Sequence, residues 1–138
     1  MNLFFDTSAL LKHYIQERGS ESIDSLFLEA DEIFVSEITI VESFSALSRL
    51  VHEKSITKKQ CSLVFKEIEH DHHYFSIVPL VDSFKNAMEA IYKYQLKTLD
   101  GLQIGSALVV KEQIDNFVCS DKKLSNAAKS ENFSVLAL

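Results

Sequence analysis

Five short apolar runs, spaced along the chain, constrain its fold more than any other feature of the sequence. Each run is rich in aromatic or β-branched residues and is bounded by polar residues, which is the pattern of a buried strand. The longer stretches between the runs carry apolar residues at helical spacing. Because no hairpin turn joins one run to the next, the alternation predicts an α/β fold with crossover connections and a parallel sheet. The predicted strands are Leu3–Phe5, Ile33–Val35, Ile77–Val78, Phe117–Cys119 and Ser134–Leu136.

Length and composition favour a single domain over residues 1–138. Of the 138 residues, 46% are hydrophobic, and no linker, low-complexity segment or repeat interrupts them. The interval between the third and fourth strands has room for two helices, Asp82–Gln95 and Leu99–Glu112, with Thr98 as the N-cap of the second. Gly101 and Gly105 lie four residues apart in that second helix and would let it approach its neighbour closely.

Net charge and apolar patterning limit the classes of partner. The net charge of −6 has the wrong sign for a protein that holds nucleic acid by broad phosphate neutralisation, so such a role would need local cations or bound metal. No apolar stretch approaches the roughly 20 residues that span a bilayer, and no secretory leader is recognisable, so we expect a cytoplasmic protein without a membrane role. Cys61 and Cys119 fall in apolar patterns and are expected to be free, buried thiols.

Four acidic residues occupy positions where parallel α/β proteins bind ligands. Asp6 directly follows the first predicted strand and Asp121 lies just past the fourth, at the carboxyl ends that line the ligand crevice of an open sheet. Asp100 begins a helix, and Glu42 lies in the helix after the second strand. Taken singly, each has an ordinary explanation, because aspartate caps helices or complements their dipole and glutamate is commonly solvated.

The common edge of the sheet changes the interpretation of these acids. Strand ends and helix starts on one edge bring residues that are distant in sequence into one crevice, where four carboxylates would repel one another. Such a group must take up protons or bind hard cations, and an oxygen-only ligand set favours Mg²⁺ or Mn²⁺ over zinc. Metal ions held in this way can activate water toward a phosphorus atom, so the pattern predicts phosphodiester hydrolysis without selecting RNA.

Four segments around these acids resemble the motifs of a known family. They are similar, in order and in spacing, to the motifs of the PIN-domain nucleases, in particular the VapC-type toxins of toxin–antitoxin pairs. The similarity covers essentially the whole chain and is far more specific than any single acidic motif. The four segments are Leu3–Leu10, Val35–Leu47, Leu96–Ala107 and Phe117–Leu124.

The resemblance implies a fold, an activity and partners. The fold would be a three-layer α/β/α sandwich whose parallel five-stranded sheet has the strand order 3-2-1-4-5. One or two Mg²⁺ or Mn²⁺ ions would support endonucleolytic cleavage of RNA, and the chain would form a homodimer and bind a small cognate antitoxin that can place a basic side chain in the acidic site. The implied metal ligands are Asp6, Glu42, Asp100 and Asp121, with Ser8 and Ser120 supporting the site by hydrogen bonds.

This chain departs from the family pattern at three positions. Gly101 and Gly105 stand where small residues such as alanine are more usual, and Gln103 stands where histidine is common. None of these departures removes an acid. We therefore expect altered packing or altered substrate contact, with the chemistry retained.

Other features of the sequence have simpler explanations. His70 and His73 share a helical face, but no further ligand is apparent, so a solvated helix end is favoured over a metal site. Phe44, Phe65 and Phe84 are expected in the core because of their periodicity. Five cations near the acidic motifs could touch phosphates, although ordinary surface positions are the simpler explanation: Lys12, Arg49, Lys97, Lys122 and Lys123.

Three alternative functions remain at the level of the sequence. A phosphoacceptor receiver domain would need an aspartate at the end of its third strand, where this chain has Val78, Pro79 and Leu80. A non-catalytic binding module would share the fold, because fold alone does not establish function. A nuclease of this family could also process RNA without being a toxin.

Overall fold

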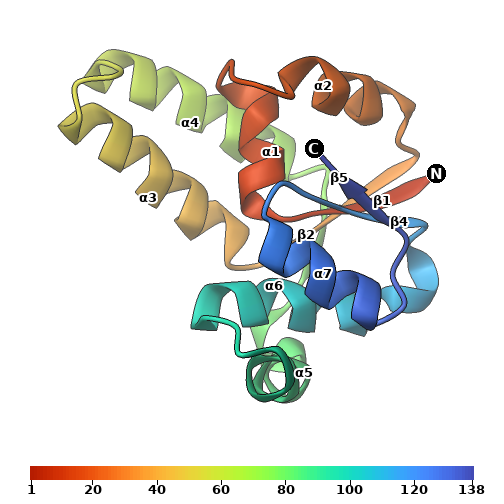
Figure 1. The fold of residues 1–138 in the computed structure, drawn as a ribbon. Coiled ribbons are helices and arrows are strands. Elements are labelled where there is room, and N and C mark those ends of the chain that lie inside the picture. Colours follow the sequence, from red (N-terminus) through yellow and green to blue (C-terminus); the bar gives the residue numbers. More distant parts are fainter.

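A computed structural model describes residues 1–138 and contains one sheet of five parallel strands (Figure 1). The strand order is β3-β2-β1-β4-β5, as the family resemblance implied. All five predicted strands are confirmed, and each of their boundaries lies within one residue of the predicted position. The strands are β1 (Asn2–Phe5), β2 (Glu32–Ser36), β3 (Ser76–Val78), β4 (Asn116–Cys119) and β5 (Val135–Ala137).

Strand β1 lies at the centre of the sheet and is buried along most of its length. Leu3, Phe4 and Phe5 have no exposed surface. Phe4 pairs in register with Phe34 of β2 on one side and with Phe117 of β4 on the other. The rings of Phe4 and Phe117 stack with their centroids 5.5 Å apart. A strand that is covered on both faces needs a continuous apolar run, which is why this segment was recognisable in the sequence.

Seven α-helices and one short 3-10 helix connect the strands. In Figure 1, α3 and α4 run side by side and extend beyond the sheet, while α5 forms the outermost helix on the far side of α6. The helices are α1 (Thr7–Tyr14), α2 (Ser20–Glu29), α3 (Thr39–His52), α4 (Lys58–His72), α5 (Leu80–Tyr94), α6 (Thr98–Val109) and α7 (Lys122–Ser130), with the 3-10 helix η1 at Lys111–Gln113.

Two apolar clusters, one on each face of the sheet, confirm the three-layer arrangement. Leu3 and Phe5 belong to the cluster that includes Leu10 of α1 and Ile23 of α2. Phe4, which points to the opposite face, belongs to the cluster formed with buried residues of α5, α6 and α7. The two faces of the sheet are therefore both covered by helices.

The helical glycines of α6 explain how closely this helix packs against α5. A Cβ atom added at Gly105 would lie 2.7 Å from the backbone nitrogen of Ala87 and 2.7 Å from the carbonyl oxygen of Ser83. A Cβ atom at Gly101 would lie 2.3 Å from Cγ1 of Ile91. The prediction that these two glycines permit a close approach is confirmed.

Several boundaries and burial predictions were wrong in detail. Thr98 is the first residue of α6, and Lys97 occupies the N-cap position without a side-chain cap. The same helix ends at Val109 rather than Glu112, because the chain tightens into η1. Phe44 and Phe84 were expected in the core, but each is 48% exposed. Helical periodicity identifies one apolar face and does not say whether a second apolar face is covered.

Candidate active site

Two of the four acids are helix caps at the carboxyl ends of neighbouring strands. Asp6 follows β1 and accepts a hydrogen bond from the Ala9 backbone N–H at 2.8 Å, which caps α1. Asp121 follows β4 and accepts one from the Leu124 backbone N–H at 2.8 Å, which caps α7. Because β1 and β4 are hydrogen-bonded neighbours, the two caps lie at the same edge of the sheet. The capping explanation is therefore correct for both residues, and their two strand ends adjoin.

Glu42 reaches this edge from the first turn of α3 and is held by two donors. The Thr7 hydroxyl donates to Oε1 of Glu42 at 2.9 Å, and Nε2 of Gln103 donates to the same oxygen at 2.8 Å. Thr7 belongs to α1 and Gln103 to α6, so three helices meet at this carboxylate. A solvated glutamate, which the sequence left open, is not what the structure contains.

Asp100 lies in the first turn of α6 and is half-buried. Burial raises its pKa, and the negative charge of Asp121 raises it further. Lys123 and Lys97 act in the opposite direction on this pKa. Among the five cations considered from the sequence, these two therefore lie close enough to act on the acidic edge. Lys12, in contrast, donates to the backbone carbonyls of Arg18 and Leu138.

The acidic side chains act on one another electrostatically. The pKa of Asp6 is raised to about 7, mainly by burial and also by the charges of Glu42, Asp100 and Asp121, against the lowering effect of the Ala9 hydrogen bond. Burial also raises the pKa of Glu42, which the hydrogen bonds from Gln103 and Thr7 partly offset. Because the neighbouring charges disfavour the ionised forms of Asp6, Glu42 and Asp100, a cation bound at this edge would be favoured.

The donor chemistry of this edge fits a hard divalent cation, although the side chains do not form a closed cage. No three His, Cys, Asp or Glu side chains lie close enough together to hold a metal ion as they stand. The oxygens of the acids nevertheless match the ligands that Mg²⁺ and Mn²⁺ prefer. The hydroxyl of Ser120, next to Asp121, is buried without a hydrogen-bond partner. A buried orphan hydroxyl beside carboxylates is consistent with a site whose remaining partner is a hydrated ion.

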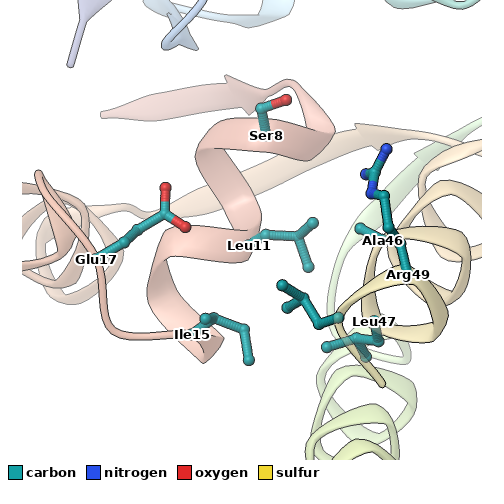
Figure 2. A pocket seen from close by; sticks show the side chains of 8 residues that line it. Ser8, Leu11, Ile15, Glu17, Ala46, Leu47 and Arg49 are labelled. Atoms are coloured by element: carbon teal, nitrogen blue, oxygen red, sulfur yellow. The ribbon is translucent and has the colours of Figure 1, made fainter. Parts of the chain in front are cut away.

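Ser8 and the histidine segment lie away from the carboxylate network. Ser8 is exposed and lines a cavity of about 250 Å³ between α1 and α3, together with Arg49 and apolar side chains. Figure 2 shows Leu11 of α1 and Ile15, the C-cap residue of that helix, pointing toward α3 across this cavity. His70 and His73 lie at the end of α4, which leads into the amino end of β3 and thus toward the opposite edge of the sheet.

Sequence reasoning missed three polar residues of this edge. Thr7 and Thr39 are buried, and their hydroxyls lie 3.0 Å apart. Gln103, only 3% exposed, contacts both threonines and Glu42. Thr7 stands within the first motif, yet nothing local reveals that its hydroxyl reaches α3. The departure from histidine at Gln103 was the one signal in the sequence that marked this position as unusual.

No helix of the protein is long and apolar enough to cross a membrane. Among curated proteins, none matches this chain. The solved structures that resemble it do so at low identity and therefore support the fold alone.

Three of these structures span nearly the full length of both chains. The toxin VapC20 of Mycobacterium tuberculosis, described as cleaving the sarcin–ricin loop, has a TM-score of 0.70 at 14% identity, with 99% of each chain covered. VapBC2 of Rickettsia felis, bound to a promoter DNA fragment, has a TM-score of 0.66 at 14% identity and covers 100% of this chain and 99% of that one. FitAcB of Neisseria gonorrhoeae has a TM-score of 0.64 at 16% identity and covers 97% and 96%.

The family model of the PIN domain matches residues 3–130, a range that contains all four acids, strands β2 to β4 and all of β1 except Asn2. The chain therefore belongs to the PIN domain family.

Proposed function

We propose that residues 1–138 form a single PIN domain that acts as a metal-dependent endoribonuclease, the toxin of a type II toxin–antitoxin pair. The observation that carries the proposal is that Glu42, Asp100 and Asp121 lie close enough to Asp6, at one edge of the sheet, for their charges to raise its pKa. Membership of the PIN family supports nuclease chemistry, and the solved structures with this fold include toxins and their complexes. The proposed metal is Mg²⁺ or Mn²⁺, as one or two ions.

The four acids would bind the metal together, and they differ in how deeply they are buried. When bound, the ion supplies a water of lowered pKa and charge stabilisation for the leaving oxygen. Asp6 is the most buried acid and is fixed by its helix cap, so it anchors the inner side. Asp121 is exposed and lies on the outer side. Ser120, through its unpartnered hydroxyl, would support bound water or substrate, and Ser8, which lines the neighbouring cavity, would contact substrate that extends beyond the acids.

Two lysines would bring the RNA backbone to the acids. Lys97 and Lys123 are exposed and act electrostatically on Asp100, so they are placed to contact phosphates that flank the scissile bond. Nζ of Lys123 also donates to the carbonyl of Gln95 at 2.7 Å, which holds that lysine beside the start of α6. An acidic protein can thus bind RNA through a few local cations and the metal, without a broad basic surface.

The proposed antitoxin would be a small protein that inserts a basic side chain among the acids. Electrostatic complementarity between the cluster of carboxylates and a cationic group would raise the association rate and the specificity of such an inhibitor. The apolar cavity between α1 and α3 (Figure 2) would receive apolar side chains of the same inhibitor. The solved structures of related fold include complexes described as toxin–antitoxin pairs, which supports this partner class.

Cleavage of RNA by purified protein tests the proposal. We expect cleavage with Mg²⁺ or Mn²⁺ that stops on chelation, and loss of at least 100-fold in rate in Asp6→Asn and Asp100→Asn. The matched control is Asp31→Asn, because Asp31 is 79% exposed in its side chain and precedes the amino end of β2. Cleavage that persists in both site variants would overturn the assignment of the active site.

Expression in cells separates a toxin from a housekeeping nuclease. The chain expressed alone should arrest growth, and co-expression of the adjacent small gene should relieve the arrest. Harmless expression of an active enzyme would instead favour a role in RNA processing.

A further inference from the structure

The two oxygens of the Glu42 carboxylate have different surroundings. Oε1 accepts hydrogen bonds from the Thr7 hydroxyl at 2.9 Å and from Nε2 of Gln103 at 2.8 Å. Oε2 accepts no hydrogen bond from the protein. Both donors come from other helices, α1 and α6, so the orientation of this carboxylate is set by tertiary packing and not by α3 itself. Oε1 is therefore hydrogen-bonded within the protein, whereas Oε2 remains available to a ligand.

Gln103 is oriented so that its nitrogen faces the acids. Nε2 lies 3.0 Å from Oγ1 of Thr7, 3.2 Å from Oγ1 of Thr39 and 2.8 Å from Oε1 of Glu42. The opposite orientation would place two acceptor oxygens, from the amide and from the carboxylate, in contact. The observed orientation leaves Oε1 of Gln103 buried without a partner. A buried polar atom without a hydrogen-bond partner is uncommon, so the hydrogen bond from Nε2 to the Glu42 carboxylate indicates a functional role for Gln103.

We propose that Gln103 is a positioning residue for Glu42. Together with Thr7 it holds Oε1, so that Glu42 presents Oε2 alone to the cation and acts as a ligand through one oxygen. The inference rests on the metal site of the proposed function and adds a residue that is not one of the four acids. Because both donors are neutral, they orient the carboxylate without removing the negative charge that attracts the metal.

A structural role alone would have different consequences from a positioning role. If Gln103 served only to fill space between α1, α3 and α6, an apolar side chain of similar size would serve as well. Leucine at position 103 would also remove the unpartnered amide oxygen, which favours the folded state. The positioning role, in contrast, requires the donated hydrogen bond, since partners that orient metal ligands typically affect metal affinity by roughly 10–100-fold when removed.

Manganese binding to the full chain without RNA tests the inference. The probe is Mn²⁺ alone, titrated by calorimetry or by electron paramagnetic resonance, and melting in EDTA reports folding. We expect Gln103→Leu to remain folded, with a Kd for Mn²⁺ raised about 10-fold. Gln103→Met, which matches the length of glutamine, provides a second apolar variant if leucine disturbs folding. Gln16→Leu is the control, because Gln16 is exposed and makes no hydrogen bond through its side chain.

A double-mutant cycle assigns the effect to Glu42. In a Glu42→Gln background, the substitution Gln103→Leu should change the Kd for Mn²⁺ by less than about 2-fold, because the ligand that it positions is already altered. Thr7→Val, which removes the second donor, should weaken Mn²⁺ binding in the same direction as Gln103→Leu. Folded Gln103 variants with the wild-type Kd, or an undiminished effect in the Glu42→Gln background, would overturn the positioning role.

The outcome also separates this inference from the ribonuclease proposal. If the wild type binds Mn²⁺ and the Gln103 variants bind it less well, positioning stands even where no RNA is cut. If RNA is cut and Mn²⁺ binding is unchanged in those variants, the ribonuclease stands and positioning fails. A wild-type protein that binds no Mn²⁺ would overturn both.

Discussion

At the scale of single residues, the most unusual group is a carboxylic acid that the fold buries at a helix cap. Asp6 is 3% exposed, and its pKa is raised to about 7 in the metal-free protein, mainly by burial. In an unfolded chain, the pKa of an aspartate side chain is about 4. The folded state therefore holds this proton more tightly than the unfolded state does. Stability supplied by that proton is present at low pH and is lost as the pH rises through the interval from about 4 to about 7.

The substitution Asp6→Asn should consequently stabilise the metal-free protein at high pH. Asparagine keeps the cap on α1 and carries no charge, so we expect a gain of about 1–2 kcal/mol at pH 8 and little change near pH 4. Thermal melting in EDTA at both pH values measures the difference. A variant that melts below the wild type at pH 8 would show that the carboxylate is not destabilising there.

The acids could be placed from the sequence, whereas the residues that hold them could not. Asp6 and Asp121 follow strands that were recognisable as apolar runs, and a parallel sheet brings such strand ends together. Thr7 and Gln103 are different, because the partner of a buried polar side chain depends on how three helices pack. Even so, the departure of Gln103 from the family pattern marks the position that connects those helices to Glu42.

At the scale of elements, the α5–α6 pair depends on the missing side chains of two glycines. The obstacle at Gly105 is backbone, namely the amide of Ala87 and the carbonyl of Ser83. At Gly101 the nearest atoms belong to the side chain of Ile91, which can change rotamer. Contact with a rigid backbone cannot be relieved without separating the two helices.

Alanine at these two glycines should therefore have unequal effects. We expect Gly105→Ala to lower the free energy of unfolding by about 2–3 kcal/mol, and Gly101→Ala by about 1 kcal/mol or less, because helix propensity offsets part of the crowding. Urea denaturation of both variants checks the order. Equal stabilities, or a more stable Gly105→Ala, would contradict the close approach of the helices.

Element boundaries were less predictable than the elements themselves. Thr98 has the side chain of a typical N-cap, yet Lys97 takes that position and Thr98 is the first helical residue. The local preference of threonine is worth only about 1 kcal/mol, which packing of α6 against α5 can override. The order of strands, in contrast, followed from the family resemblance because topology is shared across the whole family.

At the scale of the whole molecule, one helix presents an apolar stripe that nothing in the monomer covers. The exposed large side chains of α5 are Val81, Phe84, Met88 and Tyr92, spaced by three and four residues. Exposed charged residues accompany the stripe, acidic at Asp82 and basic at Lys93 near the two ends of α5. A second copy of α5 in antiparallel orientation would bring each Asp82 opposite the partner copy's Lys93 and would bury both stripes.

We expect this α5 surface to form the homodimer that the family resemblance implies. Met88→Asp, at the centre of the stripe, should shift the protein to monomer in sedimentation or light scattering across a concentration series. Glu21→Gln, on an exposed part of α2, is the control. Unchanged mass for Met88→Asp would place the dimer interface elsewhere.

If Asp6, Glu42, Asp100 and Asp121 form one metal site, crystals grown with Mn²⁺ should contain manganese among their carboxylates. The anomalous signal of manganese locates the ion without any assumption about activity. We expect a peak within about 2.0–2.4 Å of oxygens from Asp6 and at least two of the other three acids, with Oε2 as the ligating atom of Glu42. A folded, Mn²⁺-saturated protein whose anomalous peak lies away from these carboxylates would contradict this expectation.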